Sequence, residues 1–155
     1  MPDEIGPEER RYRLTSAGAH TNARNNDQRQ TMTDEELRLL VAEVVAAAED
    51  KLGQRTEAFF VGDVLGIADW FVVTSGANGR QVRAIVENIE EQLVLAGGPK
   101  PIRIEGKEHL SWVLMDYGWI IVHVFDEESR DYYDLERLWA DVPRLADVSP
   151  ASEGF

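Results

Sequence analysis

Cysteine is absent from this chain of 155 residues, so neither disulfide bonds nor thiolate ligands for zinc can stabilise it. Histidine is scarce as well, and the three histidines show no metal-ligand spacing. No apolar run reaches the roughly 18 residues of a membrane span, and the first residues lack the apolar stretch of a secretory signal. We therefore expect a soluble cytoplasmic protein that binds no metal, no cofactor and no membrane.

Positive charge is also in short supply, with 16 basic against 29 acidic residues and a formal net charge of -13. Residues 1–31 hold five arginines and five acids, so the whole acidic excess falls on residues 32–155. Such a surface repels phosphate backbones and attracts basic proteins. The charge argues against autonomous nucleic-acid binding and favours a basic protein partner.

The length and the 43% hydrophobic composition suit one compact domain. Residues 1–31 show neither a helical nor an alternating period and are rich in Arg, Asn, Gln and Thr, which predicts a disordered N-terminal extension. The folded domain is expected over residues 32–143, followed by a flexible C-terminal tail over 144–155. We also hypothesise that native translation starts at Met32, which N-terminal sequencing of the native protein would test.

The hydrophobic spacing predicts three helices and five strands. Thr33 and Glu36 form a capping-box pair at the head of the first helix, and Gly53 follows its end. Strands are expected at 56–64, 70–76, 100–106, 112–116 and 119–125, a second helix within 77–98, and a third helix over 126–142. The order predicts an α+β fold, a mixed five-stranded sheet with helices packed on it.

Three kinds of catalytic site are poorly supported by the residue spacing. The loop 74–80 opens a helix after a strand, where backbone N–H groups can bind an anion, but it lacks the phosphate-binding glycine patterns. Paired strand carboxylates for magnesium are missing, since Asp116 stands alone at a turn. Ser75, Asp116 and His123 include the residue types of a triad, without the nucleophile elbow. A nucleotide-binding or nucleotidyltransferase-like enzyme using the 74–80 loop remains the alternative.

Large aromatic residues crowd the last third of the folded region. They are Trp112, Tyr117, Trp119, Phe125, Tyr132, Tyr133 and Trp139. A core uses some of them, and so many amphipathic rings also suit an interaction face. Both interpretations stay open on this feature alone.

Three blocks of sequence resemble the Iojap-like ribosomal silencing factors in order and spacing: "ADWFVVTSGANGRQVRAIVENIEEQL", "RIEGKEHLSWVLMDYGWIIVHVF" and "SRDYYDLERLWAD". The resemblance implies a nucleotidyltransferase-like fold without its catalytic carboxylates. It also implies a non-enzymatic protein that binds the large ribosomal subunit through large-subunit ribosomal protein fourteen and sterically blocks the small subunit. The implied role is translational repression in starvation or stationary phase, with a part in large-subunit biogenesis and homodimers when free.

Carried over by position, the resemblance places partner binding on nine residues. They are Trp112, Met115, Asp116, Tyr117, Trp119, His123, Arg130, Tyr133 and Trp139. Trp112 is the expected anchor of the interface. Trp119 stands where relatives usually have Asp, and we expect it to add apolar surface. Docking of the last helix on the sheet is an equally good reading of Arg130, Tyr133 and Trp139.

Overall fold

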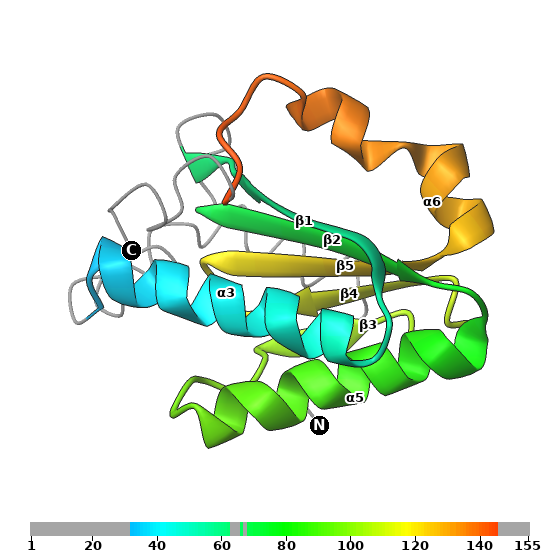
Figure 1. Ribbon diagram of the computed structural model, residues 1–155, viewed down its shortest axis with the longest axis horizontal. Helices are drawn as coiled ribbons and strands as arrows, with labels where there is room; N and C mark the ends of the chain where they lie inside the picture. The colour runs from blue at the N-terminus through cyan, green and yellow to red at the C-terminus, as the bar shows by residue number, and fades with distance from the viewer. Residues whose placement is uncertain (1–31, 63–65, 67, 146–155) are drawn as a thin grey trace, which may run out of the picture. The chain divides into compact units, whose positions relative to one another are not determined.

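The computed structural model describes residues 32–62, 66 and 68–145, so the predictions for residues 1–31 and 146–155 lie outside the described part. Figure 1 shows the elements. In chain order they are α3 (Asp34–Asp50), β1 (Gln54–Phe60), β2 (Trp70–Gly76), α5 (Gly79–Leu95), β3 (Arg103–Glu105), β4 (Trp112–Asp116), β5 (Ile120–Asp126), α6 (Glu127–Tyr133) and the 3-10 helix η2 (Leu135–Trp139). The α+β class and the order of elements are confirmed.

The five strands form one sheet in the order β1-β2-β5-β4-β3. β2 and β5 run parallel and the other neighbours antiparallel, which confirms the mixed sheet. A tight turn joins β4 to β5, where the Tyr117 N–H donates to the Ile120 carbonyl at 2.9 Å. Gly118 has φ 96 there, and its N–H donates to Asp116 Oδ1 at 2.8 Å. Gly118 and Asp116 therefore form the turn between β4 and β5.

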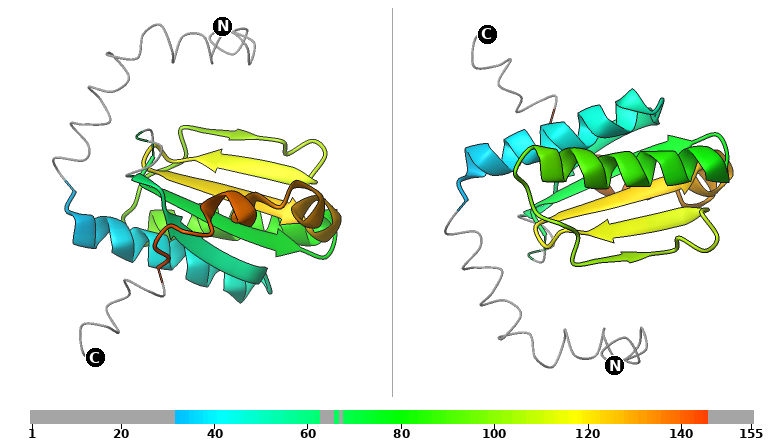
Figure 2. Two further views of the ribbon diagram at one scale, coloured as in Figure 1. Left: turned by 90° about the horizontal axis from the view of Figure 1, so that it is seen from above. Right: turned by 90° about the horizontal axis from the view of Figure 1, so that it is seen from below.

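Helices α3 and α5 lie on one face of the sheet (Figure 2). The Thr33 N–H donates to Glu36 Oε1 and the Glu36 N–H to Thr33 Oγ1, as the capping box predicts. Asn78 caps α5 by accepting from the Gln81 N–H at 3.0 Å. Asn88 is buried between the two helices and donates to the Ala47 carbonyl at 2.9 Å. None of the helices in the described residues is long and apolar enough to cross a membrane.

The last predicted helix, 126–142, is wrong as a single element, because it ends at Tyr133 and a 3-10 turn follows. Asp134 has φ 49 at the break and donates its N–H to the Arg130 carbonyl. At about 100° per residue, Arg130 and Trp139 would lie on opposite sides of a continuous helix. The break at Asp134 lets both side chains reach the sheet.

Figure 2 shows α6 and η2 on the sheet face opposite α3 and α5. The chain then returns along β1, where the Phe60 N–H donates to the Pro143 carbonyl and the Leu145 N–H to the Ala58 carbonyl. Arg144 forms an isolated antiparallel β-bridge with Phe59, and its guanidinium lies 5.2 Å from the centroid of the Phe59 ring. Arg144 and Leu145, assigned from sequence to the tail, are thus paired with the sheet.

Candidate functional site

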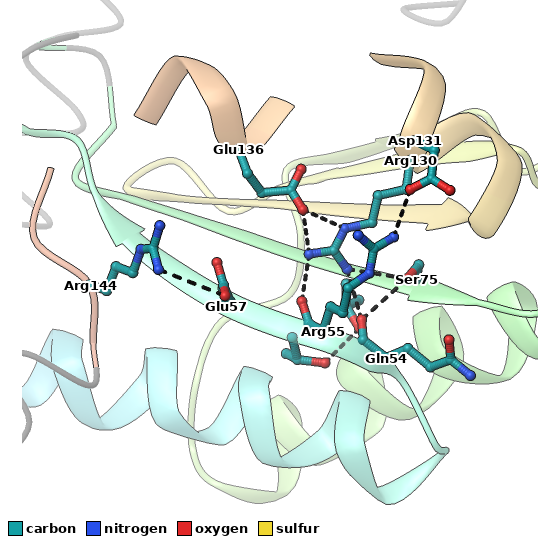
Figure 3. Close-up of polar contacts among 10 residues, drawn as sticks. Gln54, Arg55, Glu57, Ser75, Arg130, Asp131, Glu136 and Arg144 are labelled. Carbon is teal, nitrogen blue, oxygen red and sulfur yellow. Dashed lines mark hydrogen bonds and ion pairs between the residues drawn. The ribbon is translucent and has the colours of Figure 1, made fainter. Parts of the chain in front are cut away.

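Arg130 is 1% exposed and ties the C-terminal helices to the edge of the sheet (Figure 3). Its Nε donates to Glu136 Oε2 at 2.6 Å, its Nη1 to the Gln54 carbonyl at 2.7 Å and its Nη2 to the Arg55 carbonyl at 2.6 Å. Burial lowers the Arg130 pKa, and the hydrogen bond and charge of Glu136 act against that shift.

Both carbonyls are available because β1 is irregular between Gln54 and Glu57 and Arg55 adopts φ 50. Arg130 therefore has a structural role inside the protein.

The sheet face opposite α3 and α5 carries four rings and one leucine. We call this cluster the aromatic face: Phe71, Trp112, Leu114, His123 and Phe125. Strand register sets it, because Trp112 pairs with Phe125 and Leu114 with His123, and side chains alternate between the two faces. Ring centroids of Trp112 and Phe125 are 4.9 Å apart, and those of Phe71 and His123 are 4.8 Å apart. Trp112, Leu114 and Phe71 are half-buried, so this face is only partly covered.

The indole of Trp112 is fixed by His123, since its Nε1–H donates to His123 Nδ1 at 3.1 Å. His123 is 4% exposed, and burial lowers its pKa from 6.5 to about 4, so the imidazole is neutral at neutral pH. A neutral ring that accepts at Nδ1 carries its proton on Nε2, which has no hydrogen-bond partner among the described residues. His123 thus acts as an acceptor that orients the tryptophan.

Two aromatic side chains from the C-terminal helices border this face. Tyr133 of α6 lies 4.7 Å from the Trp112 ring, between centroids, and is 49% exposed. Trp139 of η2 lies edge-on to Phe71 at 5.5 Å and is half-buried. The structure therefore brings Trp112, His123, Tyr133 and Trp139 of the predicted set into one neighbourhood.

Three other predicted residues are buried in the isolated chain. Met115 is fully buried on the helix-covered face, where it pairs with Val122. Tyr117 is 2% exposed, and its pKa is raised by burial and then by the nearby Glu90. Trp119 is 4% exposed, with its carbonyl accepting from the Asp69 and Trp70 N–H groups. Trp119 thus adds no exposed apolar surface, because the turn that carries it is covered.

Asp116 lies at the end of the aromatic face. It belongs to a group of charged side chains that the sequence analysis did not predict. Arg103 of β3 is the centre of this group, 3.4 Å from Asp116 Oδ2 and 3.2 Å from Glu105 Oε2. Counting alternate residues from Trp112 along β4 and from Arg103 along β3 places Leu114 and Glu105 on this face too. This alternation along the two strands is the sequence signal that could have predicted the charged group.

The side chains considered for catalysis are engaged in other contacts and do not form a triad. The Ser75 hydroxyl donates to the Gln54 carbonyl, His123 Nδ1 accepts from Trp112, and Asp116 holds the turn and Arg103. In the 74–80 loop, the Ala77 N–H already donates to the Gln81 side chain and the Gln81 N–H to Asn78. Within the described residues, no three acidic or histidine side chains are grouped so that they could hold a metal ion.

Comparisons with known proteins point to one family. A family profile described as "Ribosomal silencing factor during starvation" matches residues 33–154. The chain is 37% identical over 114 residues to the ribosomal silencing factor RsfS of Halalkalibacterium halodurans, covering 74% of this chain and 94% of that one. It is 34% identical over 74 residues to the mouse "Mitochondrial assembly of ribosomal large subunit protein 1", covering 46% of this chain and 32% of that protein.

A solved structure agrees with these sequence matches. The crystal structure of a Chromobacterium violaceum protein superposes with a TM-score of 0.64 at 31% identity. It covers 70% of this chain and 88% of that one.

Proposed function

This chain belongs to the family of ribosomal silencing factors, and from that premise we propose that it represses translation by binding the large ribosomal subunit and blocking the small one. The proposed contact is large-subunit ribosomal protein fourteen, and the proposed occasion is starvation or stationary phase. A part in large-subunit biogenesis is included, since the name of the mouse relative refers to large-subunit assembly.

The aromatic face is the observation that carries this proposal. It presents the half-buried ring of Trp112, with Leu114 beside it, on the sheet of a chain of net charge -13. Large aromatic anchors surrounded by partly covered contacts supply most of the affinity at protein interfaces. Acidic charge speeds the approach to a basic partner without fixing the final affinity.

The mechanism we propose is steric exclusion and requires no catalysis. A domain bound to the joining surface of the large subunit occupies volume that the small subunit needs. To block joining, the domain must bind the large subunit more favourably than the small subunit that competes with it. The protein would act in the cytoplasm, and free molecules would form homodimers.

A subunit-joining assay tests the proposal. Large subunits are preincubated with the purified protein, small subunits are added, and the joined ribosomes are followed by light scattering. We expect joining to slow as protein is added and the protein to sediment with large subunits but not with small ones. Unchanged joining together with absent co-sedimentation would contradict the proposal.

A further inference from the structure

A shallow hollow of about 320 Å³ lies beside the Trp112 ring. Its lining residues are Glu105, Gly106, Trp112 and Leu114. Gly106 has φ 92, and a Cβ built there would overlap the Trp112 carbonyl oxygen. A glycine is therefore required at position 106. Because glycine has no side chain, this position adds only backbone to the lining of the hollow.

The lining combines three kinds of surface. Trp112 contributes an aromatic ring whose N–H is already bonded to His123, so the ring offers apolar surface and π-electron density rather than a free donor. Leu114 contributes aliphatic surface, and Glu105 a carboxylate whose side chain is 46% exposed. A planar cation on an aliphatic stem matches all three, because it stacks on a ring and pairs with a carboxylate.

The acidic side chains beside the hollow also favour a cation. Glu105 and Asp116 both lie within ion-pair distance of Arg103, so two carboxylates share this guanidinium. The Arg103 side chain is 31% exposed and the Asp116 side chain 15% exposed, so the group is partly shielded from water. Partial burial strengthens the attraction for a second cation.

We propose that this hollow receives an arginine side chain of the partner protein, stacked on the Trp112 ring and paired with the Glu105 carboxylate. The inference rests on the proposed function, since it specifies the chemistry by which the aromatic face recognises a basic protein. Arginine fits better than lysine because its guanidinium is planar, less strongly hydrated and able to stack while it donates to a carboxylate.

The first experiment compares two charge-neutralising variants in co-sedimentation with large subunits. Glu105→Gln keeps the shape and removes the charge in the hollow, and we expect roughly tenfold weaker binding or more, as for a lost charged hydrogen bond. Glu91→Gln makes the same change at an exposed position of α5, behind the sheet, and we expect wild-type binding. Circular dichroism is expected to show both variants folded, because exposed ion pairs contribute little stability.

A second experiment tests the hollow without ribosomes. The peptide acetyl-Gly-Arg-Gly-amide is titrated into the protein while the Trp112 indole N–H signal, assigned with Trp112→Phe, is followed by NMR. We expect this signal to shift with the arginine peptide, to shift less with the lysine peptide, and to stay fixed with the uncharged citrulline peptide. Equal shifts with arginine and citrulline would overturn the proposal.

The two experiments separate the inference from its premise. If Glu105→Gln binds large subunits as the wild type does while Trp112→Ala does not, the arginine assignment is wrong and the proposed function stands. If the wild-type protein does not sediment with large subunits, the proposed function is wrong, and the peptide titration decides the chemistry of the hollow.

Discussion

Trp112 is packed into the fold and is also the proposed anchor for the partner. His123 holds its N–H at 3.1 Å, and Phe125 and Tyr133 pack on its ring with centroids 4.9 Å and 4.7 Å away. A side chain fixed before binding loses less conformational entropy when a partner docks on it. Under the proposed function, His123 and Phe125 would therefore contribute to affinity by holding Trp112 in place.

Trp112→Ala is expected to weaken binding to large subunits by about 2–4 kcal/mol, as truncation of an interface anchor does. Co-sedimentation over a range of subunit concentrations measures the loss. Leu95→Ala removes a side chain that is 72% exposed on α5 and is expected to bind normally. If circular dichroism shows that Trp112→Ala is unfolded, the residue belongs to the core and the anchor role is wrong.

His123 predicts a pH dependence of stability. Its pKa is about 4 in the folded chain and 6.5 for a solvent-exposed histidine, so between these values the unfolded state binds more protons. Stability is therefore present above pH 6.5 and falls as the pH drops toward 4, by about 1.4 kcal/mol per pH unit from this group.

Urea unfolding at pH 7 and pH 5 of the wild type and of His123→Gln checks this. Glutamine retains an oxygen that can accept the Trp112 N–H but does not titrate. The wild type is expected to lose more stability than the variant between the two pH values. Equal losses would show that His123 is not the titrating group.

At the scale of elements, the α6–η2 segment depends on contacts distant in sequence. Arg130 bonds to carbonyls of β1 more than 70 positions earlier, and Glu136 completes the pair across the break at Asp134. Acids at the start of α6 predicted a helix correctly. Its end was not predictable from the hydrophobic period, because the partners of Arg130 lie in a bulge of another element.

Arg130→Met is expected to destabilise the protein by about 3–5 kcal/mol, because it leaves the Glu136 carboxylate and two partly buried carbonyls of β1 without the donors of a buried guanidinium. Chemical denaturation measures the change. Arg137→Met removes an arginine of η2 whose side chain is 78% exposed near Asp134, and it is expected to cost less than about 1 kcal/mol. Similar losses in the two variants would contradict the structural role of Arg130.

At the scale of the whole molecule, the proposed function predicts that net charge guides the approach to the partner. The charge of -13 resides in residues 32–155, while ion pairs such as Arg55–Asp131 and Arg103–Glu105 neutralise individual sites locally. In the proposed complex, long-range attraction would depend on the net field and the close contacts on the aromatic face.

Association with large subunits is therefore expected to slow by tenfold or more between low and roughly 0.3 M salt, while dissociation changes less, because salt screens long-range attraction. Stopped-flow measurements with labelled protein test this. Association rates that do not vary with salt would indicate that the acidic charge does not guide the encounter.

The sequence by itself determined the first two helices, the strands and the order of the elements, because capping residues, hydrophobic periods and turn glycines act locally. Thr33 and Glu36 form the predicted capping box, and Asp116 lies at the predicted turn. It also predicted that Trp112 lies on a strand of the sheet in an acidic chain.

Only the tertiary structure decided which aromatic side chains are exposed. Trp112 and Trp119 flank the same turn and look equivalent in the sequence, yet Trp112 is half-buried on the aromatic face while Trp119 is 4% exposed. Strand register, the cover given by α6 and η2, and the bulge that receives Arg130 all depend on residues far apart in the chain. Local patterns carry no information about such pairings, so burial and the shape of the surface follow only from the assembled fold.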